Sequence, residues 1–224
     1  MNAYFLVEGR RTEVKLYPAW LSVLCPNLTR VTNADAVSED NYYIFNGGGY
    51  PSILNHIHNA IEDINNIGKY DYLIICVDAD EATPEQRFKE IKDYLAQNHI
   101  VLHRAQLFII IQNRTIETWL LGNRRIVCRT PNNRNLIKYL RFYDVINNDP
   151  EKCPKHRDFS NHAHFHEAYL KEIFRERGLS YSKINPGEAQ KPAYLNELIN
   201  RIQKTNDLKS FSLFYQFVQE HLKN

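Results

Sequence analysis

Residues 70–81 read YDYLIICVDADE, and no other stretch of the chain constrains the fold as strongly. An unbroken apolar run that is closed by acids is typical of a strand buried on both faces of a parallel sheet. Side chains two residues apart in a strand point the same way, so Asp78 and Asp80 can face one pocket. This segment therefore predicts a layered α/β fold with acids at the end of a buried strand.

Strand-like and helix-like segments alternate from the N-terminus to about residue 125. The strand-like runs are AYFLVEG, NYYIFN, YDYLIICVD and AQLFIIIQ, and helical spacing of apolar residues follows at 12–24, 52–67, 84–98 and from Thr115, a plausible N-cap. This order predicts βαβ units, and so a mainly parallel sheet with helices on both faces. Pro18 is expected to kink the first helix or to mark its true start.

The pattern changes in the last third of the chain, where only helical segments are predicted. They cover residues 135–146, 164–177, 192–204 and 211–223, and Pro-, Asn- and Asp-rich joints separate them. We therefore expect a sheet-containing domain at residues 1–128 and a helical C-terminal extension at residues 129–224 packed on it. One compact domain is the alternative.

Composition narrows the cellular setting and the partners. The chain has 224 residues, a formal net charge of +2 and four widely spaced cysteines without a CxxC pair. These features favour a reducing, cytoplasmic protein without a disulfide framework, and the absence of an 18-residue apolar run argues against a membrane span. Basic residues gather only in NRRIVCRTPNNR (residues 123–134) and KCPKHR (residues 152–157), as a solvated face or a local nucleic-acid contact.

Acidic residues follow two of the predicted strands. Glu8 ends the first, and Asp78, Asp80 and Glu81 lie at the end of the strand-like run YDYLIICVD. In open parallel sheets ligands bind at the carboxyl ends of the strands, so we expect these carboxylates to converge there. Converging carboxylates need a compensating cation, and hard oxygen ligands suit Mg²⁺ or Mn²⁺. The alternative is that the aspartates only cap the next helix.

Three motifs carry a resemblance to a known family. VEGRRTE (residues 7–13), VDADE (residues 77–81) and QNRTIETWLL (residues 112–121) occur in that order. Together they resemble the TOPRIM domain of RloB-like and OLD-like (overcoming lysogenization defect) nucleases. The resemblance covers about residues 3–125 and implies a TOPRIM-like catalytic domain.

The resemblance implies roles for five acids. Glu8 matches a glutamate that acts in general acid/base chemistry or binds metal, and Asp78 and Asp80 match metal-binding aspartates. Glu13 and Glu117 match acids that complete a second metal position or orient the first, so one or two ions are implied. Glu117 has a second interpretation, because an acid in the first turn of a helix also interacts favourably with the helix dipole. Trp119, by contrast, is expected in the core with Leu120 and Leu121.

The residues beside these acids are candidates for substrate contact. Gly9 is interpreted as the turn that lets the chain leave the strand without covering the pocket. Arg10 is a candidate for binding a phosphodiester and Arg11 for offsetting charge during catalysis, although both could instead pair with Glu13 or nearby acids. OLD-like nucleases resemble one another in using a lysine after the acidic motifs, and Lys183 is the candidate here, with a solvated lysine as the alternative.

A run of three glycines, Gly47, Gly48 and Gly49, separates a strand from a helix. The spacing fits neither GxxxxGK[ST] nor GxGxxG, which argues against a nucleotide-binding loop. The run is either a tight turn or a loop that lets backbone approach a substrate, with Gly48 as the candidate contact.

A histidine-rich segment lies at residues 153–166. Its potential ligands are Cys153, His156, His162, His164 and His166. The spacing matches no strong zinc pattern, so capping and packing are favoured over a structural zinc ion, and one histidine could contact substrate phosphate.

We therefore expect a Mg²⁺-dependent endonuclease that acts on DNA or on RNA such as tRNA. RloB-like proteins are typically encoded with an ABC/SMC-like ATPase in bacterial anti-phage defence, so the resemblance implies an ATPase partner. The alternative is a metal-binding regulatory module that docks on such an ATPase without turnover. The oligomeric state stays open, a homodimer included.

Overall fold

The computed structural model describes residues 1–223, which pack as two compact units. Unit 1 comprises residues 1–77, 84–111 and the C-terminal segment from residue 216, and unit 2 comprises residues 78–83 and 112–215. The expected domain boundary between residues 128 and 129 stays a prediction.

Unit 1 is built on a five-stranded parallel sheet in the order β2-β3-β1-β4-β5. The strands are β1 (Asn2–Val7), β2 (Thr29–Arg30), β3 (Asn41–Asn46), β4 (Tyr72–Asp78) and β5 (Gln106–Gln112). β1 lies between β3 and β4, and all its residues are buried. The predicted α/β class with a parallel sheet is confirmed. Only β2 was not predicted, because two exposed residues leave no periodic pattern.

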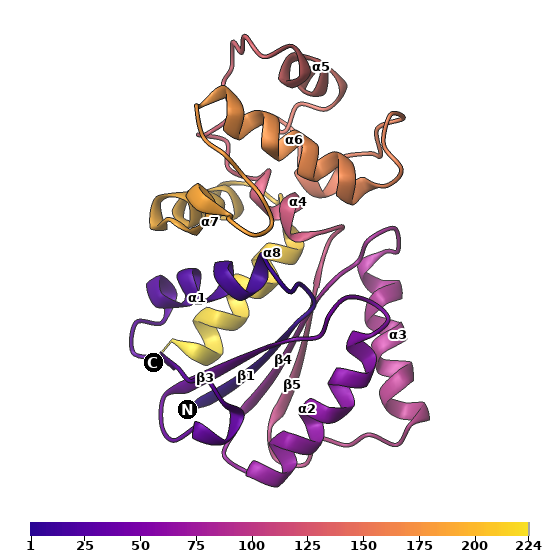
Figure 1. Ribbon diagram of the computed structural model, residues 1–224, viewed down its shortest axis with the longest axis vertical. Helices are drawn as coiled ribbons and strands as arrows, with labels where there is room; N and C mark the ends of the chain where they lie inside the picture. Colours follow the sequence, from indigo (N-terminus) through magenta and orange to yellow (C-terminus); the bar gives the residue numbers. More distant parts are fainter. Residues whose placement is uncertain (224) are drawn as a thin grey trace. The chain divides into compact units, whose positions relative to one another are not determined.

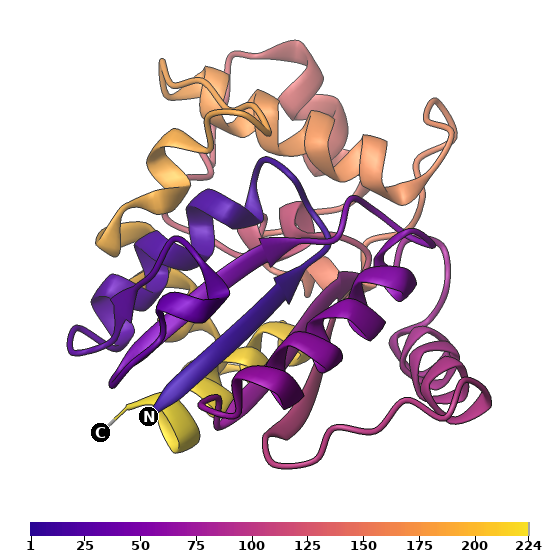
Figure 2. The ribbon, with the colours of Figure 1, turned by 60° about the horizontal axis from the view of Figure 1, so that its bottom comes forward.

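Helices cover both faces of this sheet, as predicted. α1 (Glu13–Leu24) lies on one face, and α2 (Ile53–Ile67) and α3 (Pro84–Gln97) lie on the other (Figures 1 and 2). α2 buries its isoleucines at helical spacing and ends at Gly68, whose left-handed conformation is typical of a helix C-terminus. α1 begins at Glu13 and continues through Pro18, so the proposal that Pro18 marks the helix start was wrong.

The end of the chain belongs to unit 1. Phe217 and His221 pack on Tyr72 of β4 and Phe108 of β5, with 4.5 Å between the ring centroids of Phe108 and Phe217. The helix predicted over residues 211–223 forms α8 (Lys209–Phe217) and continues as a π-helical turn at Val218–Leu222. The last turn of the chain thus covers the two strands that lead to the candidate site.

Unit 2 is mainly helical, which confirms the helical C-terminal portion. It holds α4 (Ile116–Leu120), α5 (Arg134–Phe142), α6 (His162–Glu176), α7 (Pro192–Lys204), most of α8, and 3₁₀ turns at Pro150–Lys152 and Gly187–Gln190. Trp119 of α4 packs against Phe211 and Phe214, and its Nε1 donates to Ser210 Oγ at 2.7 Å. Trp119, Leu120 and Leu121 are buried, as predicted.

All four cysteines are free thiols. No helix within residues 1–223 combines the length and the apolarity that crossing a bilayer would demand.

Candidate functional site

Glu8 lies where β1 ends, in unit 1. Its N–H donates to Cys76 O at 2.9 Å and so extends the pairing of β1 with β4. One carboxylate oxygen, Oε1, accepts the N–H of Tyr50 at 3.0 Å. Glu8 O also accepts the N–H of Gly49 at 3.2 Å. Two segments that the sequence analysis singled out separately, VEGRRTE and the glycine run, therefore lie together.

Gly9 makes room for the buried carboxylate of Glu13. A Cβ atom at position 9 would collide with that carboxylate, which belongs to the first residue of α1. Glu13 is only 3% exposed, so it does not face solvent. Glycine is thus required after β1 because the Glu13 side chain approaches closely, and not because the backbone adopts an unusual angle.

Arg10 and Arg11 are exposed beside the glycine loop. A Cβ atom at Gly48, where φ is +74°, would lie 2.6 Å from Arg10 Nη2, so the Arg10 guanidinium rests against this glycine. Within residues 1–223 neither arginine forms an ion pair, so the alternative pairing with Glu13 is not present. Both guanidinium groups are available to an anion.

The VDADE acids form a turn that belongs to unit 2. Asp80 has φ of +53°, a left-handed conformation that aspartate tolerates better than most residues. Its N–H donates to Arg114 O at 2.9 Å, and Arg114 Nη1 donates in return to Asp80 O at 3.1 Å and to Ala82 O at 2.9 Å. Arg114 is itself left-handed, with φ of +65°. Strained residues held by such bonds often mark functional sites.

Glu81, the last residue of VDADE, pairs with His162 at the start of α6. Its carboxylate accepts the backbone N–H of His162 at 2.8 Å and lies 2.9 Å from Nδ1 of the ring. Burial acts to raise the pKa of Glu81, but the hydrogen bonds from His162 outweigh it and lower the pKa below its ordinary value. Neither this pair nor the role of Arg114 was predicted from the sequence, although QNRTIETWLL contains that arginine.

Glu117 and Lys183, two candidates that the resemblance implied from separate segments of the chain, lie near each other. Glu117 is 1% exposed, and its Oε1 accepts a hydrogen bond from the Tyr181 hydroxyl at 2.8 Å. Lys183 Nζ lies 4.0 Å from Glu117 Oε1 and 3.7 Å from Glu167 Oε2. Glu117 is therefore a buried, hydrogen-bonded acid, and Lys183 is a half-exposed cation at the edge of it.

The members of the histidine-rich segment have separate partners. His164 Nδ1 lies 2.7 Å from Ser160 Oγ, His166 Nδ1 lies 2.8 Å from Thr118 Oγ1, and His156 packs among the rings of Tyr139, Phe142 and Phe165. Cys153 is buried, which raises the pKa of its thiol to about 12. His162 and His166 thus anchor α6 to VDADE and to α4 respectively.

The donors near the strand ends are oxygen atoms of carboxylates, the type that Mg²⁺ and Mn²⁺ prefer. Among residues 1–223, no three His, Cys, Asp or Glu side chains are grouped so that they could hold a metal ion by themselves. Mg²⁺ is commonly bound by one or two carboxylates together with water and substrate phosphates, so the donor chemistry fits this ion without a closed protein cage.

Comparisons of the chain with protein-family models, curated proteins and solved structures gave no match. The resemblance to TOPRIM proteins therefore depends on the three motifs and stays a prediction.

Proposed function

We propose that this chain is a metal-dependent nuclease of the TOPRIM type that hydrolyses phosphodiester bonds in DNA or in RNA such as tRNA. In this proposal it is cytoplasmic and serves as the effector of a bacterial anti-phage defence system, together with an ATPase partner. Its Mg²⁺ or Mn²⁺ would be bound through Asp78 and Asp80.

The turn at residues 78–83 is the observation that best supports the proposal. Asp80 adopts a left-handed conformation where β4 ends, and the backbone and side chain of Arg114 hold it there. Such strain costs on the order of 1–3 kcal/mol, and a merely structural turn could avoid it with glycine. A fixed aspartate is what binding an ion in a defined position requires.

The other candidate residues would act on the substrate. A bound metal ion would lower the pKa of water and neutralise charge on the scissile phosphate. Glu8, oriented by the Tyr50 N–H, would take or give a proton or bind metal. Arg10 and Arg11, which are exposed and form no ion pair with any described residue, would bind phosphate, with Gly9 and Gly48 keeping their surroundings open. Glu13 and Glu117 would support a second ion.

The test is a cleavage assay with the purified chain. Labelled tRNA, single-stranded DNA and duplex DNA are incubated with Mg²⁺, Mn²⁺ or EDTA. We expect cleavage of at least one substrate with metal and none with EDTA. Asp80→Asn and Glu8→Gln should each lower the rate by about 100-fold or more, the usual contribution of acid/base and electrostatic groups.

Matched controls distinguish an effect of the candidate site on the cleavage rate from an effect of losing any negative charge. Asp35→Asn and Glu39→Gln remove the same charges at exposed positions of unit 1 and should leave the rate unchanged. The regulatory alternative predicts the opposite result: no cleavage under any condition, and full biological activity of Glu8→Gln in cells. That pair of results would refute the nuclease proposal.

A further inference from the structure

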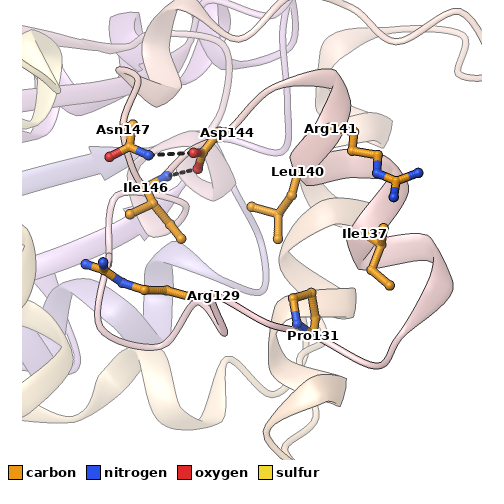
Figure 3. A pocket seen from close by; sticks show the side chains of 8 residues that line it. All are labelled: Arg129, Pro131, Ile137, Leu140, Arg141, Asp144, Ile146 and Asn147. Carbon is orange, nitrogen blue, oxygen red and sulfur yellow. Dashed lines mark hydrogen bonds between the residues drawn. The ribbon is translucent and has the colours of Figure 1, made fainter.

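A groove beside α5 in unit 2 has no role in the proposed catalysis. We call it the α5 groove, and Figure 3 shows the side chains that line it, namely Arg129, Pro131, Ile137, Leu140, Arg141, Asp144, Ile146 and Asn147. Its volume is about 370 Å³, and it is open to solvent. Part of it comes from the basic stretch at residues 123–134, which the sequence analysis left between a solvated face and a nucleic-acid contact.

The two arginines of the groove carry charge that the protein does not neutralise. Arg129 and Arg141 are exposed, and within residues 1–223 neither forms an ion pair. Figure 3 shows their guanidinium groups at opposite ends of the groove, with Leu140 and Ile146 between them. Unit 2 as a whole has 18 Lys and Arg against 14 Asp and Glu, whereas unit 1 has 10 against 12. The groove thus suits a ligand with anionic groups at two points.

The middle of the groove is apolar and half-exposed. Pro131, Ile137, Leu140 and Ile146 leave part of their side chains uncovered there. A flat apolar ring can pack on such a surface, as unpaired bases do between apolar side chains and guanidinium planes. Phosphates alone would gain nothing from this floor, which favours a ligand that carries both phosphates and bases.

A polar pair, Asp144 and Asn147, forms one side of the groove. The Asp144 carboxylate accepts the Ile146 N–H at 2.9 Å and the Asn147 Nδ2 at 2.7 Å. The second bond orients the Asn147 amide, whose oxygen points away from Asp144 and from the other lining residues (Figure 3). The negative charge of Asp144 keeps phosphates away from this side and at the arginine ends.

From this combination we infer that the α5 groove binds single-stranded nucleic acid, with an unpaired base on the apolar floor and flanking phosphates on Arg129 and Arg141. The inference rests on the proposed function in its choice of nucleic acid, and it adds a binding site outside the residues assigned to catalysis. A duplex would keep its bases stacked and would not use the floor.

Binding is measured in EDTA, so that the result does not depend on cleavage. The probes are fluorescent 15-nucleotide single strands of DNA and RNA, the same DNA length with abasic sites, and the corresponding duplex, each titrated by fluorescence anisotropy over a range of salt concentrations. We expect a normal single strand to bind more tightly than the abasic strand and the duplex, by about tenfold, because stacking of a base contributes about 1–3 kcal/mol.

The test variant is Arg129→Gln with Arg141→Gln, and the matched control is Lys204→Gln with Lys209→Gln. The control removes two exposed charges of unit 2 that lie outside the groove and have no ion pair among the described residues. The test variant should bind about tenfold more weakly or worse, and its slope of log affinity against log salt should fall by about 1.4, as expected for two lost contacts to single-strand phosphates. The control should match the wild type.

Each outcome tests the groove assignment separately from the nuclease proposal. Absence of binding by the wild type, equal loss in test and control variants, or equal affinity for abasic and normal strands would overturn the groove assignment. Binding through the groove without cleavage would leave the groove assignment in place and refute only the nuclease proposal. Cleavage with an unchanged KM in the test variant would support the nuclease proposal and overturn the groove assignment.

Discussion

His166 allows a quantitative test of how unit 2 holds α4. It is 0% exposed, and its Nδ1 lies 2.8 Å from Thr118 Oγ1. Because Thr118 Oγ1 already accepts the Thr115 N–H at 3.2 Å, its hydroxyl hydrogen can be donated to Nδ1, which requires a neutral ring. Burial, with a further contribution from the nearby charge of His162, lowers the pKa of His166 to about 3.

The sign and size of the effect follow from linkage. In the unfolded chain a histidine titrates near pH 6.5, so below that pH the unfolded state takes up a proton that the folded state does not. Folded unit 2 therefore loses stability as the pH falls from about 6.5 towards 3. One pH unit corresponds to about 1.36 kcal/mol, so His166 should cost about 2.7 kcal/mol at pH 4.5 relative to pH 7.5.

The assay uses the two tryptophans of the chain, Trp20 in unit 1 and Trp119 in unit 2. In a Trp20→Phe background, Trp119 fluorescence during urea unfolding reports on unit 2. The free energy of unfolding is measured at pH 7.5 and 4.5 for His166→Asn and for His164→Asn, an exposed control on the same helix. The control should lose about 2.7 kcal/mol more than His166→Asn between the two pH values.

Comparing pH differences removes the cost of the cavity that His166→Asn leaves, since that cost is the same at both pH values. Equal losses in His166→Asn and the control, or an NMR titration of the His166 ring near pH 6.5, would refute the reasoning.

Three further changes have definite expected outcomes. Gly9→Ala should destabilise unit 1 by about 1–3 kcal/mol in thermal unfolding, because the new Cβ atom collides with the Glu13 carboxylate. Adding Glu13→Ala should recover part of that loss. Purely additive effects of the two substitutions would contradict the geometry. Arg201→Met should lower the free energy of unfolding in urea by about 3–5 kcal/mol, because buried Arg201 donates to three backbone carbonyls and to Asp207. A decrease below about 1 kcal/mol would show that this hydrogen-bond network contributes little to stability. Lys183→Met should change the free energy of unfolding by less than about 1 kcal/mol, because the ion pairs of Lys183 are half-exposed. The same substitution should lower the cleavage rate. An unchanged cleavage rate would show that Lys183 has no role in catalysis.

Local pattern was sufficient to predict most of the elements in this chain. The apolar run before Asp78 and the isoleucine spacing of α2 each indicate which residues are buried. Both elements lie within a few residues of the expected bounds. The prediction was less accurate where local pattern is weak or misleading. β2 has two exposed residues, and α1 continues through Pro18 because packing of its buried face outweighs the missing hydrogen bond.

The amino-acid sequence was enough to assign the α/β class, to place the acids at strand ends and to locate the motifs, because each depends on residues close together in the chain. The pairings that shape the candidate site join distant residues instead. Asp80 is held by Arg114, Glu81 by His162, and Glu117 by Tyr181, across separations of 34, 81 and 64 residues. No spacing rule relates such positions, because their approach depends on how whole helices and strands pack. Folding thus determines which of the acids are buried, which are paired and which conformation Asp80 adopts.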